Sequence, residues 1–424
     1  MKLKLNIRFF VLIAAVLFSD NLSAQITQQR LENDPVTGAG IFRPYFLSVD
    51  EVASMSSDGG GRYEPFYISH FGRHGSRYYS QPKSWQHTID CLNTAKEEGI
   101  LTEKGERLYC YVKTIFDAHD QMYGELAPLG AVEHRQIARR MFTREKKVFT
   151  SKKRTQVRCA ASVVARCLMS MANFTEELSS LAPDLDVSYL AGRRYNNEYL
   201  NAQAEDFSME SARILDSIKV ASLRPETLIK EYFTDAGRAC RIVTDRYAFE
   251  MGLYYFWAIC HDLDFLNIDM TPLIPIEELL RCVKVDNAYR YANVCVSEEF
   301  GKYTRVKGVK LLRDFVAKAG DALQEDSKIA ADFRFAHDSA FLPMCALLGI
   351  EGYPIYTVEE AHRSWNAADV VPMCSNLQMV FYKDGHDILV KVLVNEREAS
   401  IRSLTPVQDR YYRWDDIRQM IEKL

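Results

Sequence analysis

Strand-forming segments lie toward both ends of the sequence, and a long helical stretch separates them. The strand candidates are short runs of aromatic and branched residues at 65–69, 148–151, 332–336, 377–382 and 388–394. The last two predict a hairpin, because Asp384-Gly385 in their connection is a strong turn signal. Residues 183–300 are polar and Tyr-rich, with helical periodicity. The pattern predicts an α/β fold, with a central mixed sheet flanked by helices and an inserted, mainly helical cap domain.

The length of the chain fits this division. It has 424 residues, which is more than a single hydrophobic core usually holds. We therefore expect a core built from residues 25–182 and 301–424, with residues 183–300 inserted as the cap. No repeat and no low-complexity tract argues for another arrangement.

The first 24 residues have the three-part pattern of a secretory signal peptide. Positive charge comes first, at Lys2, Lys4 and Arg8, and an apolar run follows at 9–18. Small residues before Gln25 then offer a cleavage site. The alternative is an uncleaved anchor, but the apolar run is short for a bilayer, and no later stretch approaches ~20 uninterrupted apolar residues. We expect a periplasmic or secreted protein without stable membrane insertion.

Charge and cysteine content limit the kinds of ligand and partner that we expect. A formal net charge of −4 gives no whole-protein case for binding nucleic acid or an anionic membrane, so any anion site must be local. The ten cysteines are scattered over the mature part, and no pair has the close double spacing of a zinc site. Export permits disulfides, but the spacing predicts no particular pairing.

The strongest chemical signal is the segment Arg73-His74-Gly75-Ser76-Arg77, at the end of the first strand candidate. Phosphoryl transfer needs a nucleophile, cations on the equatorial oxygens and an acid for the leaving oxygen. Neutral imidazole is a competent nucleophile, and guanidinium groups match phosphate oxygens in pairs. The alternative is a surface loop without a catalytic role, in which a histidine happens to lie between arginines.

A second polar pair, His337-Asp338, follows the strand candidate at 332–336. His337 is suited to bind a phosphoryl oxygen, and Asp338 to hold the proton for the leaving group. Bound phosphate would raise the pKa of Asp338 by like-charge repulsion. Open α/β sheets gather sites at the carboxyl ends of their strands, so we expect both motifs to meet there.

A third candidate is Arg158, which follows the strand candidate at 148–151 and precedes Ser162. It would donate a further guanidinium to phosphate. The stretch from Arg139 to Arg158 is strongly basic, with Glu145 as its single acidic residue. It is either a solvated helix face or a positive field that steers a polyanionic substrate into the cleft.

Taken together and in this order, these motifs resemble clade two of the histidine phosphatase superfamily, which includes histidine acid phosphatases, phytases and multiple inositol polyphosphate phosphatases. The resemblance spans nearly the whole mature chain. It implies that His74 is the phosphorylated nucleophile and that Asp338 is the proton donor. It also implies a phosphate pocket, no metal and no organic cofactor. The pocket residues would be Arg73, Arg77, Arg158 and His337.

Two positions depart from the family pattern. Tyr79 stands where the first motif commonly has a proline. The second motif is His337-Asp338-Ser339, as in acid phosphatases and many phytases, whereas multiple inositol polyphosphate phosphatases typically have His-Ala-Glu there. The end of the chain, Val392 to Arg397, nevertheless looks like the latter group. The subfamily therefore stays open.

The expected substrate is a small phosphate monoester, with inositol polyphosphates such as phytate favoured by the basic segment and the export signal. Three alternatives stay open. The first is a broad-specificity acid phosphatase for sugar phosphates or nucleotides, and the second is a phosphotransferase or mutase. The third is a phosphate-binding protein without catalysis, against which the intact His74 and Asp338 argue.

Overall fold

The computed structural model describes residues 25–54, 63–385 and 387–424. The predicted signal segment, residues 1–24, lies outside these ranges. Within them, no helix is both long enough and apolar enough to cross a membrane.

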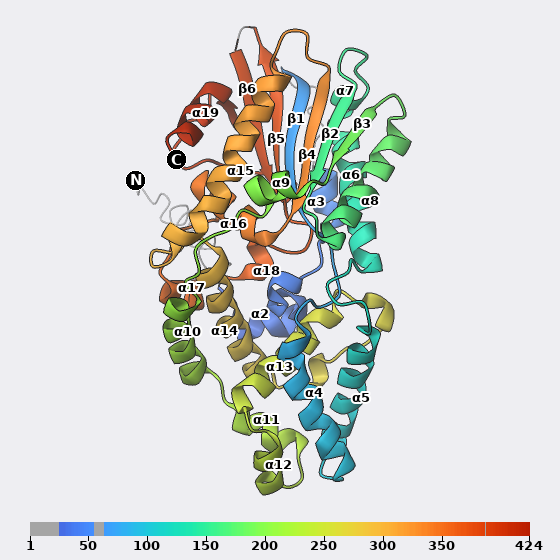
Figure 1. The fold of residues 1–424 in the computed structure, drawn as a ribbon, viewed down its shortest axis with the longest axis vertical. Coiled ribbons are helices and arrows are strands. Elements are labelled where there is room, and N and C mark those ends of the chain that lie inside the picture. The colour runs from blue at the N-terminus through green and yellow to red at the C-terminus, as the bar shows by residue number, and fades with distance from the viewer. Residues whose placement is uncertain (1–24, 55–62, 386) are drawn as a thin grey trace, which may run out of the picture.

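A mixed sheet organises the upper part of the molecule in Figure 1 and confirms the predicted α/β fold with its central mixed sheet. Its strands lie in the order β3-β2-β4-β1-β5-β6-β7, and β8 pairs with β6. The first four strands in this order are parallel, and the rest are antiparallel to their neighbours. The strands are β1 (Glu64–Arg73), β2 (Gln156–Ala161), β3 (Asp186–Leu190), β4 (Ile329–Ala336), β5 (Asn376–Asp384), β6 (Asp387–Val394), β7 (Arg397–Glu398) and β8 (Tyr411–Arg413).

Helices cover both faces of this sheet. On one face, α6 (Pro128–Arg144) and α8 (Ala165–Leu181) pack against each other, and Phe174 of α8 meets the rings of Phe333 and Phe335 from β4. On the other face lie α15 (Gly301–Ala322) and α16 (Asp338–Leu347). The last helix, α19 (Trp414–Glu422), packs beside β6 and β8. Strand β1 lies between these layers and is almost entirely buried.

The lower half of the molecule is helical and draws on two parts of the chain (Figure 1). The predicted cap range supplies α10 (Ser208–Ser222), α11 (Pro225–Tyr232), α12 (Ala236–Ile242), α13 (Arg246–Cys260) and α14 (Ile276–Val294). Helices α4 (Pro82–Glu97) and α5 (Glu103–Ala118) join them, because α4 packs on α13 and α5 on α11. Strand β3 lies in the sheet although it falls within the range 183–300. The predicted domain boundaries stay a prediction.

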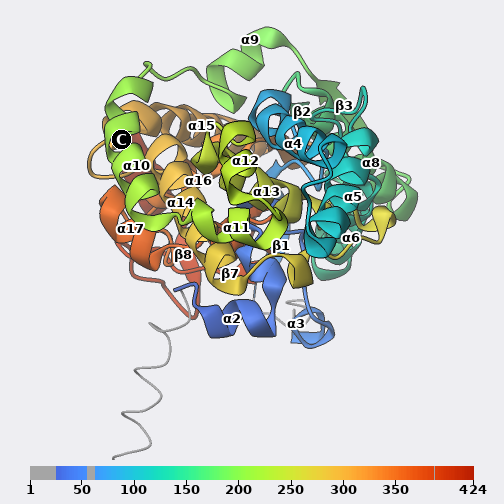
Figure 2. The same cartoon turned by 90° about the horizontal axis from the view of Figure 1, so that it is seen from below.

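The remaining helices are short. They are α2 (Gln28–Asn33), α3 (Val49–Ser54), α7 (Lys146–Phe149), α9 (Arg193–Tyr195), α17 (Val358–Ser364) and α18 (Ala367–Val370). Figure 2 views the molecule from the helical end, with α11, α12 and α13 toward the viewer.

Most strand predictions are confirmed, and one is wrong. The candidates at 65–69 and 332–336 lie within β1 and β4, and the predicted hairpin is β5 with β6. Residues 148–151, however, form the end of α7 and a turn, and the strand begins at Gln156. Val148 and Phe149 are buried as an apolar patch on this short helix. A short apolar run does not distinguish strand from helix by itself.

The carboxyl ends of β1, β2 and β4 lie side by side. Arg73 is in register with Ala336, and Ala161 with Phe335, so all three strands end at the same level. The chain leaves them at His74, Ser162 and His337. This edge of the sheet faces the helical half in Figure 1, where α16 starts directly after β4.

Candidate active site

Arg73, the last residue of β1, reaches the site with a fully buried side chain. Its Nη1 donates hydrogen bonds to the carbonyl oxygens of Ile41 (2.8 Å) and Val371 (2.7 Å), which fix the guanidinium plane. Nε and Nη2 have no hydrogen-bond partner among the described residues. Nη2 lies 3.6 Å from Oδ2 of Asp338. A buried guanidinium with unused donors is suited to receive an oxyanion.

His74 follows directly and is almost completely buried. Its Nδ1 lies 3.0 Å from the carbonyl oxygen of Gly75, which assigns the proton to Nδ1 and leaves the lone pair on Nε2. Burial lowers the pKa of His74 well below 6.5, and the nearby positive charges of Arg166, Arg73 and Arg77 lower it further. The imidazole is therefore neutral near pH 7, as nucleophilic attack requires.

The loop after His74 is held by the start of α6. Glu133 accepts hydrogen bonds from the Ser76 N–H (2.8 Å) and the Ser76 hydroxyl (2.9 Å). Gly75 and Gly130 allow the two segments to approach, because a Cβ on Gly75 would lie 2.7 Å from the Gly130 Cα. One on Gly130 would lie 2.3 Å from the Ser76 carbonyl oxygen. No side chain fits between loop and helix, which explains the glycines at both positions.

This close approach predicts that Gly130→Ala destabilises the protein by about 1–3 kcal/mol, because the backbone of Ser76 must shift. It should also lower activity, since the shifted loop carries His74. The matched control is Gly320→Ala in α15, where an added Cβ meets nothing within 4 Å and helix propensity favours alanine. Chemical denaturation of both variants checks this. Equal stabilities for the two variants would contradict it.

His337 lies across from His74, with 5.6 Å between the ring centroids. Its Nε2 is 3.1 Å from the Ser162 hydroxyl oxygen, and its Nδ1 is 3.4 Å from Nη2 of Arg166. Burial lowers its pKa to about 3, and the charge of Arg166 contributes in the same direction. Two neutral imidazoles therefore face the same space.

Asp338 opens helix α16, and its Oδ1 accepts a hydrogen bond from the Ser339 N–H (2.8 Å). Burial by itself would raise its pKa, but the positive charges of Arg73 and Arg290 outweigh that effect and hold the pKa below 3.8. Asp338 is thus ionised in the ligand-free protein. A bound phosphate would neutralise the same arginines and raise the pKa of Asp338 again.

Arg77 and Arg166 complete a positive cluster around the two histidines. The Arg77 side chain lies over the ring of Phe42, 5.2 Å from its centroid, and its Nη1 donates to the Tyr78 carbonyl oxygen. Burial lowers its pKa to about 9, and the charges of Arg166 and Arg73 add to this. Such repulsion among buried cations is relieved by an anionic ligand.

Arg166 is a site residue that the sequence reasoning missed. It lies in the first turn of α8, just beyond the loop that leaves β2. Besides its contact with His337, its Nη1 lies 3.3 Å from the Gly124 carbonyl oxygen. The available signal was its distance of four residues from Ser162, at the start of the helix that follows a strand.

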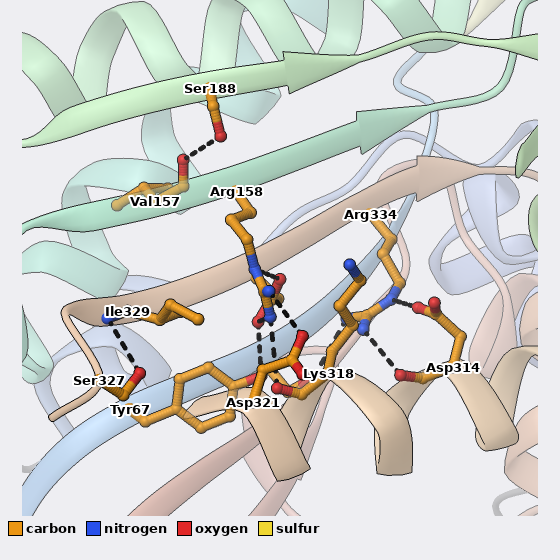
Figure 3. Close-up of polar contacts among 12 residues, drawn as sticks. Tyr67, Val157, Arg158, Ser188, Asp314, Lys318, Asp321, Ser327, Ile329 and Arg334 are labelled. Carbon is orange, nitrogen blue, oxygen red and sulfur yellow. Dashed lines mark hydrogen bonds and ion pairs between the residues drawn. The ribbon is translucent and has the colours of Figure 1, made fainter. Parts of the chain in front are cut away.

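The prediction that Arg158 belongs to the phosphate pocket is wrong. Arg158 lies inside β2, and Figure 3 shows its side chain directed toward Asp321 and Lys318 on the α15 face of the sheet. Its Nε and Nη2 bind the Asp332 carboxylate at 2.7 and 2.8 Å, and its Nη1 binds Asp321 at 2.8 Å. These carboxylates satisfy the guanidinium, and Arg166 is the arginine from this part of the chain that contacts His337.

The basic segment lies away from the site. Many of its charges pair with carboxylates: Arg139 with Glu177, Arg140 with Glu396, Arg144 with Glu145, Lys152 with Asp184, and Arg158 with Asp332 and Asp321. The segment also precedes β2, so it leads to the amino end of that strand, opposite the site. The positive charges that act on His74 and His337 belong to Arg73, Arg77 and Arg166.

Two further cations reach the site from the helices that flank it. Arg290 of α14 is paired with Asp286 at 3.3 Å, and its charge lowers the pKa of Asp338. Lys307 of α15 is half-buried, and burial lowers its pKa although Asp338 opposes that shift. His70, by contrast, is packed among phenylalanines, stacked on Phe174. It belongs to the core beneath the site.

Buried neutral histidines are unusually frequent in this protein, and they predict sensitivity to acid. The buried histidines with lowered pKa values are His70, His74, His119 (about 4), His134 (about 3) and His337 (about 3), all chiefly through burial. Desolvation also lowers the pKa of the half-buried His261 to about 4. Below about pH 6.5 the unfolded chain binds protons that the folded chain does not, so the free energy of unfolding must decrease as the pH is lowered.

The expected loss is about 1.4 kcal/mol per pH unit for each fully buried histidine between its folded-state pKa and about 6.5. Glu250 opposes it, because burial raises its pKa to about 7. Burial also raises the pKa values of Glu133 and Asp262. Because these carboxyl groups are fewer than the histidines, the melting temperature should be lower at pH 5 than at pH 7. A melting temperature that is constant or rises over this range would contradict the prediction.

The arrangement of this site agrees with the resemblance of the motifs to the histidine phosphatase superfamily. No family model and no curated protein matches the sequence. Among solved structures, the chain is similar to the multiple inositol polyphosphate phosphatase of Bifidobacterium longum in complex with inositol hexasulfate. The TM-score is 0.77 at 18% identity, over 91% of this chain and 97% of that chain.

Phytases share the same fold. The phytase of D. castellii superposes with a TM-score of 0.65 at 14% identity, over 95% of this chain and 91% of that chain. The Hafnia alvei phytase in complex with myo-inositol hexakis sulphate gives 0.56 at 12% identity, over 86% and 97%. The chain therefore has the fold of the inositol polyphosphate phosphatases and phytases over most of its length.

Proposed function

We propose that this protein is a phosphomonoesterase that transfers the phosphoryl group of inositol polyphosphates, such as phytate, first to His74 and then to water. The observation that carries the proposal is the neutral, buried imidazole of His74, whose free Nε2 faces a cluster of guanidinium groups and the pair His337-Asp338. The substrate class is supported by the similar structures, two of which hold sulfated inositols.

In the first step, Nε2 of His74 attacks phosphorus and the bond from phosphorus to the ester oxygen breaks. Asp338 gives its proton to the departing oxygen. That proton arrives with the monoanionic ester, or is bound when phosphate raises the pKa of Asp338. Arg73, Arg77 and Arg166 hold the equatorial oxygens, and their preorganised charge stabilises the transition state.

In the second step, water attacks phosphorus and the bond to Nε2 of His74 breaks. Asp338, now ionised, takes the proton from that water, and inorganic phosphate leaves. The hydrogen bond from Nδ1 to the Gly75 carbonyl keeps the imidazole in the tautomer that both steps need. His337 accepts from Arg166 at Nδ1, so its proton is on Nε2, and this N–H turns from the Ser162 hydroxyl oxygen to a phosphoryl oxygen when the ester binds.

The export of the protein to the periplasm or outside the cell is part of this proposal, since it rests on residues 1–24 alone. A second candidate function is a broad-specificity acid phosphatase for sugar phosphates or nucleotides, which the motif His337-Asp338-Ser339 favours. A phosphotransferase or mutase would share the phosphohistidine step and would pass the group to another acceptor.

Phosphate release from phytate and from an aryl phosphate, with EDTA present throughout, tests the proposal. We expect metal-independent release from both substrates, faster from phytate. Release from the aryl phosphate alone would favour the broad-specificity phosphatase. Phosphohistidine that forms without release to water would indicate a transferase, and neither phosphohistidine nor release would refute catalysis.

A further inference from the structure

Asp262 is a carboxylate that the helical half of the molecule places against the phosphate loop. It lies two residues beyond α13 and is fully buried. Its Oδ2 accepts a hydrogen bond from the main-chain N–H of Arg77 at 3.3 Å. Its Oδ1 has no hydrogen-bond partner among the described residues. The residue thus connects a segment more than 180 positions away to the loop that carries His74.

This arrangement is costly for the folded protein. A buried carboxylate normally accepts several hydrogen bonds, and an oxygen left without any loses about 1–3 kcal/mol or more of solvation. Asp262 has a single, long hydrogen bond. Glu133, on the other side of the same loop, is satisfied by Ser76 and Tyr45. Glu133 suffices to anchor the loop, so stability alone does not account for Asp262.

The charges around Asp262 are those of the phosphate pocket. Burial raises its pKa well above 3.8, and the negative charge of Glu133 adds to this, while Arg77 and Arg73 oppose it. The thiols of Cys374 and Cys260 also face it, and burial keeps both neutral by raising their pKa values. The carboxyl group therefore takes up and releases its proton at higher pH than an ordinary aspartate.

We propose that Asp262 is a positioning residue for the phosphate pocket, whose hydrogen bond holds the main chain at Arg77 and whose negative charge competes with phosphate for Arg73 and Arg77. The inference rests on the proposed function, because the competing ligand is the phosphate group of the substrate and product. Protonated, Asp262 leaves both guanidinium groups to the ligand. Ionised, it weakens phosphate binding and promotes product release.

Two substitutions separate the hydrogen bond from the charge. Asp262→Asn keeps the shape and an acceptor oxygen for the Arg77 N–H but removes the charge. It should bind inorganic phosphate about tenfold more tightly than the wild type at pH 8, with a difference that shrinks toward pH 5. Asp262→Ala removes the acceptor as well, so it should bind phosphate more weakly than Asp262→Asn at every pH. The control is Asp264→Asn, two residues on and exposed, which should match the wild type.

Calorimetric titration of the full chain with inorganic phosphate measures this without turnover, and circular dichroism confirms folding. If Asp262→Asn binds phosphate like the wild type at both pH values, or like Asp262→Ala, the inference is overturned. Wild-type protein that binds phosphate but hydrolyses no monoester would refute the proposed function and leave the test of Asp262 intact. The same tightening should appear in product inhibition and in KM, with kcat not increased.

Discussion

His74→Ala is expected to lower phosphate release from phytate and from aryl phosphates by about 10⁴-fold or more. An effect of this size is usual when a catalytic nucleophile is removed from a group of residues that act together. The reason is geometric. His337 is the other imidazole in the pocket, but Ser162 and Arg166 engage its two nitrogens, so it cannot replace His74. The residual rate would come from the arginines, which still bind and polarise the ester.

The measurement is steady-state phosphate release, together with rapid quenching and mass spectrometry to find phosphate on His74 in the wild type. The substitution His362→Ala, a half-buried histidine on α17, is the control and should keep full activity. Substantial activity in His74→Ala, or phosphate trapped on another histidine, would show that the mechanism is wrong. Retained phosphate binding in His74→Ala would show that the pocket itself is intact.

The sequence allowed the sheet and most of the site to be predicted because those features are local. Strands β1 and β4 are continuous buried runs, and each ends in a polar loop. Since they are parallel neighbours, their loops had to meet, which brought His74 and His337 together. Similar local evidence, an Asp-Gly turn between two apolar runs, revealed the β5–β6 hairpin.

Features that depend on distant partners could not be predicted in this way. Arg158 follows an apolar run and looks like a ligand for phosphate. Its place is decided by Asp332, 174 residues further along the chain, which is in register with it on β4. The strand itself is hard to recognise, because the polar Gln156 and Arg158 flank Val157 and leave a buried run of only three residues at its end. The missing information was which carboxylate lies opposite which arginine.

The same limit applies to the helical half and to the basic segment. Helices α4 and α5 precede the predicted insertion by many residues, and only their contacts with α13 and α11 place them with the cap. The charges between Arg139 and Arg158 suggested a positive field, but many of them form ion pairs with carboxylates distant in the sequence, such as Glu396. Composition reports the charges of a segment, whereas function depends on which charges remain unpaired.

Arg166→Ala is expected to lower kcat/KM by about 10²–10³-fold, the usual effect of removing one donor to a developing oxyanion. Arg166 contacts His337. Burial lowers the pKa of His74 most, and the positive charge of Arg166 has the next largest effect. Its removal should therefore also raise the pKa of His74 and shift the acidic limb of the pH–rate profile upward. Arg166→Lys should recover part of the rate, because it restores the charge without the forked donors.

Arg158→Ala is the matched counterpart and should give the opposite pattern. It leaves the buried Asp332 carboxylate without its cationic partner and with the Tyr67 hydroxyl as a remaining donor, which should cost about 3 kcal/mol of stability. Activity per folded molecule should stay near that of the wild type, since Arg158 lies on the α15 face of the sheet. Arg158→Lys, which keeps a charge for Asp332, provides a more stable second test. Thermal unfolding and kcat/KM should be measured for all four variants. Loss of catalysis in the Arg158 variants, with Arg166→Ala unaffected, would place Arg158 in the phosphate pocket and contradict the site described above.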